Sequence, residues 1–338
     1  MFHIKMTTLS SLLLFVCLFL YVSLSDSSAI PLYFDIGGIN ASELQPSSVK
    51  GIDFKQIFEC PHPCGLVSTF INNSSINGGI PQLMNMTLHF DTIQKTFDRH
   101  LLQNESRYMD FDFESWNPIW ERNSNKSMIR LKSVEYVRSR YPNWTNEQVE
   151  ETAKEEFESA ALTVFIETLS FMRKIRPSLK IGMYSYPARY YYNGYNSTSG
   201  NILREENDNL FPLWCEMDAI FPSVYQFYNS CNSTTIKNNN ENYVRSNVRE
   251  AVRISVETKN RCNTNTRLPV FVYTWHRYHD GIHLVCDQDE LMAWNISMEE
   301  GADAIILWGD ERKTQQEFES YWKNDFVPMF TNWKSHTQ

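Results

Sequence analysis

The chain has 338 residues, of which 42% are hydrophobic, and its formal net charge is −9 at pH 7. This length suffices for one large domain or two ordinary ones, and the apolar content can fill a sizeable core. The acidic balance argues against nucleic acid as a partner, since binding a phosphate backbone needs clustered basic side chains.

Residues 1–29 have the form of an export signal. His3 and Lys5 precede an apolar run over residues 12–22, and a stretch rich in serine and alanine follows. The run is too short for a comfortable membrane span, so we expect cleavage near residues 25–29. The predicted location is secreted or extracellular, or a lysosomal-type secretory compartment, without a membrane anchor. An uncleaved signal anchor is the alternative.

Ten N-x-S/T sequons also indicate export and predict N-glycans. They lie at Asn40, Asn72, Asn73, Asn85, Asn104, Asn125, Asn143, Asn196, Asn232 and Asn295.

Six cysteines remain once Cys17 is removed with the signal. They are Cys60, Cys64, Cys215, Cys231, Cys262 and Cys286. An even number in an exported chain predicts disulfides, with the connectivity left open. The Cys60-Pro-His-Pro-Cys64 spacing suits a metal, but no second Cys/His pair at ligand spacing accompanies it. We therefore expect bridges here, and neither a metal nor another cofactor.

Short apolar strands, polar loops and amphipathic helices alternate along the rest of the chain. Strands are expected over residues 30–36, 54–58, 108–116, 180–187, 219–225, 268–275 and 303–309, and helices over 87–102, 128–140, 145–176, 242–256, 288–300 and 314–330. A loop rich in Tyr, Asn and Ser is expected after Pro187. This order predicts an α/β fold, a distorted TIM-like barrel of about seven strands, as a single domain over residues 30–338.

One acidic strand is the most informative stretch. Side chains alternate between the two faces of a strand, so Asp110, Asp112 and Glu114 share one face, and the residues between them are apolar. A buried strand does not tolerate three like charges without a use for them, which predicts a polar cleft. A chance alternation on an edge strand is the alternative reading. Asp110 either shares a proton with Asp112 or is a hydrogen-bonded core acid.

The other predicted strands end in aromatic side chains. In parallel barrels the working groups sit where strands end and loops begin. Tyr184, Tyr225, Trp275 and Trp308 fall at that edge together with Glu114. Each aromatic taken alone is more typical of a core. Taken together with the acids, they predict a cleft for a sugar chain.

Asp112 and Glu114 approach a ligand from the same side, with backbones about 6.6 Å apart. This suits substrate-assisted glycoside hydrolysis with retention, in which Glu114 donates a proton to the glycosidic oxygen and a 2-acetamido oxygen of the substrate attacks the anomeric carbon. Asp112 would orient that acetamido group. Glu114 must carry a proton to act, and a nearby carboxylate favours this state, so an acidic optimum is predicted.

At this point the sequence resembles the hyaluronidases of glycoside hydrolase family 56, as a divergent member. The likeness spans residues 77–322 through an ordered set of segments. They are Asn77-Gly78-Gly79-Ile80-Pro81, Asp112-Phe113-Glu114-Ser115-Trp116, Gly182-Met183-Tyr184-Ser185-Tyr186-Pro187, Pro222-Ser223-Val224-Tyr225, Val248-Arg249-Glu250-Ala251-Val252-Arg253-Ile254 and Ile305-Ile306-Leu307-Trp308-Gly309.

The resemblance implies a barrel that cleaves hyaluronan, and often chondroitin, inside the chain at β-1,4 bonds after N-acetylhexosamine. By motif position, Glu114 resembles the proton donor and Asp112 its acetamido-positioning partner. Tyr184, Tyr225 and Trp308 resemble the aromatics around the N-acetyl group, and the partner implied is a glycosaminoglycan.

Two departures concern positive charge. Asn117 and Asn247 stand where the family usually has arginine, and Arg245, Arg189 or Lys180 are the candidate substitutes. The acidic motif also resembles that of family 18 chitinases, which act on a neutral polymer. Two alternatives therefore stay open: a chitinase-like hydrolase of N-acetylglucosamine polymers, and a secreted sugar-binding barrel without catalysis.

Overall fold

The computed structural model describes residues 32–37, 54–59, 64–123, 127–188, 190 and 194–337. The expected signal segment lies outside these residues, as do Cys60, Arg189, Asn40 and Asn125.

The strands form one parallel ring. They are β1 (Leu32–Gly37), β2 (Phe54–Gln56), β3 (Phe58–Glu59), β6 (Tyr108–Phe111), β7 (Lys180–Met183), β8 (Phe271–Trp275) and β9 (Ala304–Asp310). A separate antiparallel hairpin consists of β4 (Thr69–Ile71) and β5 (Ser74–Ile76).

Pairings between neighbours close this ring. The consecutive strands β2 and β3 pair with β1 and β6 respectively, so residues 54–59 join the two sheets. On the other side, single bridges from residues 220–223 connect Tyr184 with β8, and β8, β9 and β1 complete the circle. Seven described segments thus follow one another in chain order, and the predicted barrel is confirmed. The expected strand over residues 219–225 is reduced to isolated bridges.

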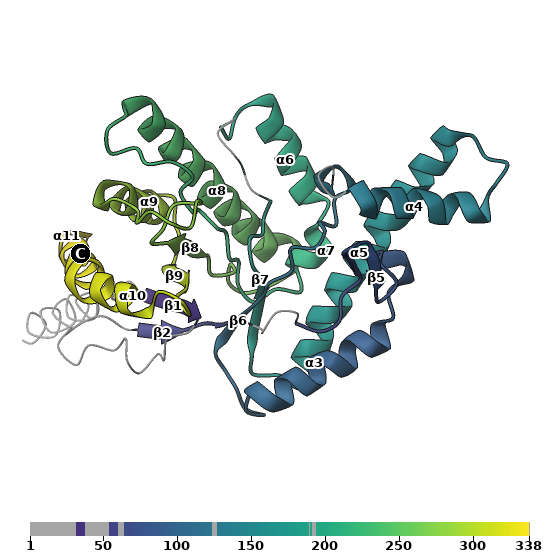
Figure 1. The fold of residues 1–338 in the computed structure, drawn as a ribbon, viewed down its shortest axis with the longest axis horizontal. Coiled ribbons are helices and arrows are strands. Elements are labelled where there is room, and N and C mark those ends of the chain that lie inside the picture. The colour runs from purple at the N-terminus through teal and green to yellow at the C-terminus, as the bar shows by residue number, and fades with distance from the viewer. Residues whose placement is uncertain are drawn as a thin grey trace, which may run out of the picture.

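Helices surround the strands (Figure 1). They are α3 (Met86–His100), α4 (Ser127–Arg140), α5 (Asn146–Ile175), α6 (Thr198–Asp208), α7 (Phe211–Trp214), α8 (Thr234–Arg261), α9 (Asp287–Glu299), α10 (Gln315–Tyr321) and α11 (Val327–Thr337). Short 3-10 helices span Pro81–Leu83 and Trp120–Asn123, and a π-helical turn, Trp322–Phe326, joins α10 to α11.

Two helices, α6 and α7, occur where only a loop was expected. The segment that forms α6 is polar, and Leu203 is the one apolar side chain among its buried residues Gly200, Leu203 and Asn207, so it has too few apolar positions to reveal a helical repeat. The side chain of Ser197 starts this helix by accepting a hydrogen bond from the Gly200 amide at 3.0 Å.

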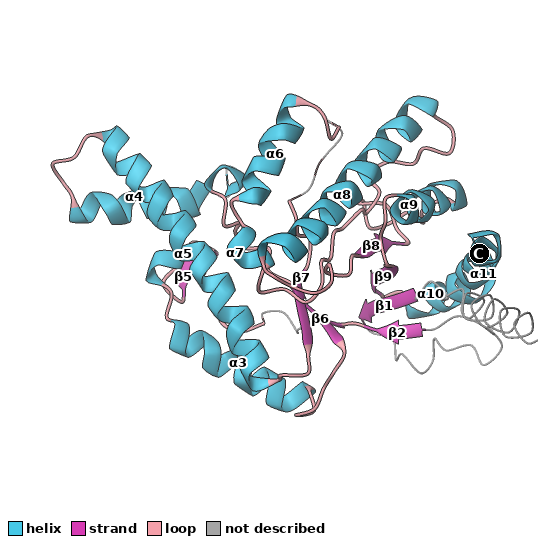
Figure 2. Ribbon diagram, turned by 180° about the vertical axis from the view of Figure 1, so that it is seen from behind, coloured by secondary structure: helices cyan, strands magenta, loops and turns pink. Residues whose placement is uncertain are grey.

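The long helix α5 begins as the sequence predicts. The Thr145 hydroxyl accepts from the Gln148 amide at 3.2 Å, and the Gln148 side chain accepts from the Thr145 amide at 3.0 Å, which makes a capping box. Its first part and α4 project from the barrel as a helical hairpin (Figure 2). One face of the helix is buried, and Phe165 in its later part packs against Phe111 of the strand that carries the acids.

Disulfides join Cys215 to Cys262 and Cys231 to Cys286, and Cys64 is disulfide-bonded as well. The eight sequon asparagines among the described residues are all exposed. None of the described helices combines the length and apolar character needed to cross a bilayer.

Candidate active site

The acidic stretch begins on β6 and continues past the end of that strand. Met109, Phe111 and Phe113 are buried in the core, as the alternation predicts. On the other face, Asp110 is 1% exposed, Asp112 is half-buried and Glu114 is exposed. The three carboxylates line one pocket of about 220 Å³, and their exposure rises from Asp110 at its base to Glu114 at its rim.

An aromatic cluster packs against the apolar face of this stretch. The Trp116 ring stacks on Phe165 of α5 with centroids 5.0 Å apart, and Phe113 packs against the same ring at 5.5 Å. The Trp116 indole also donates to the Ser68 carbonyl at 2.8 Å. Since Phe113 and Trp116 flank Glu114 in the chain, the cluster fixes the backbone that presents this carboxylate.

The four predicted aromatics form a continuous wall of the pocket. Tyr225 stacks on Trp308 with centroids 5.5 Å apart, and Trp275 meets the same Trp308 ring edge to face at 5.1 Å. Tyr184 continues the wall at 6.3 Å from Tyr225. The Tyr184 hydroxyl donates to the Ser223 hydroxyl at 3.3 Å. These side chains come from three strand ends and one neighbouring loop, and the barrel brings them together.

Three further lining residues were not predicted. Asp35 lies in β1 and accepts a hydrogen bond from the Tyr273 hydroxyl of β8 at 3.2 Å. The strand-end rule would have indicated Asp35, had it been applied to the first strand. His279 also lines the pocket and follows β8 by four residues, where no local pattern marks it.

The two asparagines at the family's arginine positions have structural contacts. The Asn247 amide is 4% exposed and bonds both backbone groups of Tyr190, donating to its carbonyl at 2.8 Å and accepting from its amide at 2.9 Å. The Asn117 amide donates to the Tyr186 hydroxyl at 3.4 Å. Burial raises the pKa of Tyr186 above its ordinary value, and the Glu114 charge adds to this, so the hydroxyl stays protonated.

The candidate substitute cations that the structure describes do not line the pocket. Lys180 begins β7 beside Tyr108, at the end of the barrel opposite to Glu114. Arg245 forms ion pairs with Glu299 and Glu300.

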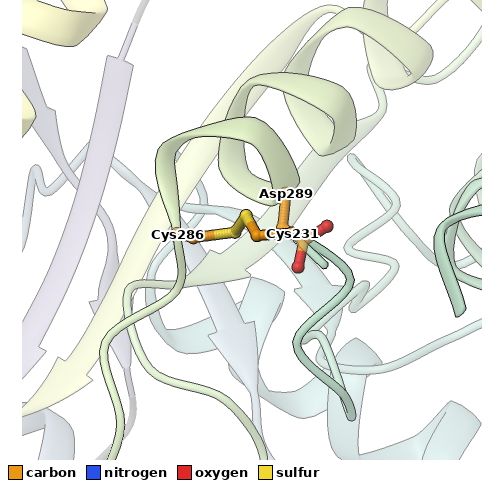
Figure 3. A group of neighbouring side chains, drawn as sticks. All are labelled: Cys231, Cys286 and Asp289. Atoms are coloured by element: carbon orange, nitrogen blue, oxygen red, sulfur yellow. A yellow bond between two sulfur atoms is a disulfide. The ribbon is translucent and has the colours of Figure 1, made fainter. Parts of the chain in front are cut away.

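Within the described residues, one group of side chains has the proximity of a metal site: Cys231, Cys286 and Asp289 (Figure 3). The two sulfurs are bonded to each other and are therefore not thiolate ligands. The Asp289 carboxylate, 1% exposed, accepts from the Ser230 amide at 2.9 Å and from the Tyr278 hydroxyl at 2.8 Å. The group is a structural clasp between two loops.

A parallel β/α barrel with carboxylates and aromatic rings at the carboxyl ends of its strands defines the class of barrel glycosidases. The chain belongs to the hyaluronidase family, glycoside hydrolase family 56, because the family model described as hyaluronidase matches residues 67–335.

Relatives and solved structures agree with this assignment. Hyaluronidase-2 of Homo sapiens is 31% identical over 277 residues, which cover 78% of this chain and 57% of the human protein. The hyaluronidase of Apis mellifera is 32% identical over 269 residues, covering 75% of this chain and 66% of the bee protein. The chain thus spans little more than half the length of the mammalian relative.

The crystal structure of bee venom hyaluronidase superimposes with a TM-score of 0.75 at 26% identity, covering 89% of this chain and 99% of that chain. Its complex with a hyaluronic acid tetramer gives a TM-score of 0.76 at 25% identity, with coverages of 89% and 98%.

Proposed function

We propose that the protein is a secreted endo-glycosidase that hydrolyses β-1,4 N-acetylhexosaminide bonds of hyaluronan, chondroitin or both. The observation that carries the proposal is the pocket that an exposed Glu114 and a less exposed Asp112 line together with an aromatic wall. The likeness to a bee venom enzyme solved with a hyaluronic acid tetramer supports the choice of polymer.

In the proposed mechanism the two acids act at different depths. Glu114, at the exposed rim, donates its proton to the glycosidic oxygen as the bond to the leaving sugar breaks. The 2-acetamido oxygen of the substrate attacks the anomeric carbon from the opposite face and forms an oxazolinium ion. Asp112 orients the acetamido group and stabilises the positive charge. Water then opens the ring, with Glu114 as the base, and the anomeric configuration is retained.

The aromatic wall binds the sugar that undergoes this reaction. Tyr225, Trp308 and Trp275 offer ring faces for the apolar side of a pyranose, and Tyr184 supplies a hydroxyl at the same level. Asp110, 1% exposed, lines the base of the pocket beside Asp112 and completes the acidic face that binds the substrate.

A neutral polymer is the second candidate substrate, because Asp35 adds a fourth carboxylate to the pocket. This negative charge opposes a polyanion and leaves chitin oligomers unaffected.

The test is incubation of the purified, glycosylated protein with hyaluronan, chondroitin and chitin oligomers from pH 3.5 to 7. Glu114→Gln is the inactive comparison, with an expected loss of about 10²- to 10⁴-fold in kcat. Glu121→Gln is the matched control, since Glu121 is exposed and pairs with Lys154 away from the pocket.

Chain shortening of hyaluronan or chondroitin that only Glu114→Gln lacks supports the proposal, and so does a product released as the β-anomer in proton NMR. Cleavage of chitin oligomers alone supports the neutral-polymer reading. Binding of a polymer without cleavage, by the wild-type protein and by Glu114→Gln alike, indicates a non-catalytic barrel.

A further inference from the structure

The pocket is lined by acidic side chains, and a polyanionic substrate brings further carboxylates beside them. Four carboxylates, from Asp35, Asp110, Asp112 and Glu114, line about 220 Å³. Hyaluronan and chondroitin carry a carboxylate on every second sugar. Like charges repel, so a uronate beside this pocket needs a positive partner.

One described lining residue can become positive, and it is His279. Its side chain is exposed at the rim, whereas among the described candidates Arg245 pairs elsewhere and Lys180 lies at the far end of the barrel. Histidine side chains commonly gain a positive charge as the pH falls from 8 to 5. The activity of an enzyme with a glutamic acid proton donor is expected to rise over the same range.

The imidazole is held in a defined position. Its ring lies parallel to the Phe227 ring, with centroids 4.3 Å apart and an interplanar angle of 8°. The His279 amide donates to the Gln226 carbonyl at 2.9 Å. Stacking on Phe227 restrains the ring while its edge, which carries both nitrogens, remains available to a ligand.

The loop that carries Phe227 is itself clasped to the loop that carries His279. The Cys231–Cys286 disulfide ties the two together, and buried Asp289 accepts hydrogen bonds from Ser230 on one side and Tyr278 on the other (Figure 3). Ser230 and Cys231 follow Phe227 by three and four residues, and Tyr278 immediately precedes His279. An exposed side chain with this much support is typical of a binding group.

Asp280, which is adjacent to His279 in the chain, already has hydrogen-bond partners of its own. Asp280, the next residue, binds the His283 ring at 2.7 Å and accepts from the amides of Ile282 and His283. These hydrogen bonds lower the pKa of Asp280 to about 2, so its charge is constant above pH 4. The described titratable groups that line the pocket together with His279 are the four acids and the hydroxyls of Tyr184, Tyr225 and Tyr273.

We propose that His279, as an imidazolium, binds the carboxylate of the uronate next to the N-acetylhexosamine in the pocket and thereby determines specificity for a uronate-bearing polymer. This inference rests on the proposed function. It assigns the residue no part in breaking the bond. The charge on His279 makes binding of hyaluronan, but not of a neutral polymer, depend on protonation.

The experiment compares hyaluronan with carboxyl-reduced hyaluronan, in which each uronate is a neutral glucose. KM and kcat are measured for the wild-type protein, His279→Ala and His279→Arg from pH 5 to 8. We expect His279→Ala to raise KM for hyaluronan roughly tenfold at pH 5, as the loss of one charged hydrogen bond predicts, and to leave KM for the reduced polymer unchanged. His279→Arg should restore a low KM at every pH, whereas the wild-type KM should rise towards pH 8.

His283→Gln is the matched control, since His283 is exposed in the same hairpin and does not line the pocket. Should His279→Ala fold poorly, His279→Gln keeps a polar side chain and answers the same question. Equal effects of the variant on both polymers, or none on hyaluronan, would overturn the inference. A wild-type protein that cleaves neither hyaluronan nor chondroitin overturns the proposed function instead, and this is known before any variant is compared.

Discussion

A buried carboxyl group outside the pocket makes the stability of the protein depend on pH. Glu290 of α9 is 3% exposed, and it accepts a hydrogen bond from the Tyr321 hydroxyl at 2.8 Å. Burial raises the pKa of Glu290 from 4.5 to about 8, and the charge of Asp287 adds to this, although the Tyr321 bond opposes it. The folded protein therefore holds Glu290 in its neutral form over most of the physiological range.

The sign of the effect follows from proton binding by the two states. Below pH 4.5 both the folded and the unfolded chain bind the proton, so stability is fully present. Between pH 4.5 and about 8 the unfolded chain releases the proton and the folded chain keeps it, so stability falls as pH rises. The shift corresponds to a loss of at most ~5 kcal/mol, or about 10 °C in Tm for a chain of this size.

Glu290→Gln removes this dependence, because glutamine resembles the neutral acid at every pH. We expect the Tm of the variant to match that of the wild-type protein near pH 4.5 and to exceed it by several degrees at pH 8.5. Scanning calorimetry at pH 4.5, 6.5 and 8.5 measures the gap. Glu299→Gln is the control on the same helix, since Glu299 is exposed. A Tm gap that does not change with pH would refute the reasoning.

Three other perturbations have defined outcomes. Burial lowers the pKa of His89 to about 4, so between pH 6.5 and 4 the unfolded chain binds a proton that the folded chain does not, and stability falls as pH falls. His89→Gln should therefore lose less Tm than the wild-type protein over this range, and an equal loss of Tm would contradict this. Phe165→Ala removes the ring behind Glu114 and should destabilise the fold by about 3 to 5 kcal/mol in denaturant unfolding; it should also lower kcat, and unchanged activity would show that the cluster does not position the acid. Asp289→Asn should lower the free energy of unfolding by about 2 to 3 kcal/mol in calorimetry, whereas exposed Asp287→Asn should lower it by under about 1 kcal/mol. Equal effects would show that Asp289 does not hold the two loops together.

The sequence by itself determined the order of most strands and helices and the face on which the acids lie. Both depend on local periodicity, because alternation along the strand places Met109, Phe111 and Phe113 on the face opposite to the acids. The capping box at Thr145 is local in the same sense. For the same reason the polar helix α6, which has a weak apolar stripe, was expected as a loop.

The tertiary structure decided which distant residues share the pocket. Tyr225, Trp308 and Asp35 come from three parts of the chain, and only closure of the barrel brings them to Glu114. It also decided that the buried Asn247 amide hydrogen-bonds the backbone of Tyr190, and that His279 lines the rim of the pocket. The reason is physical: periodicity records which face a residue presents, whereas its partners depend on pairings between strands far apart in sequence.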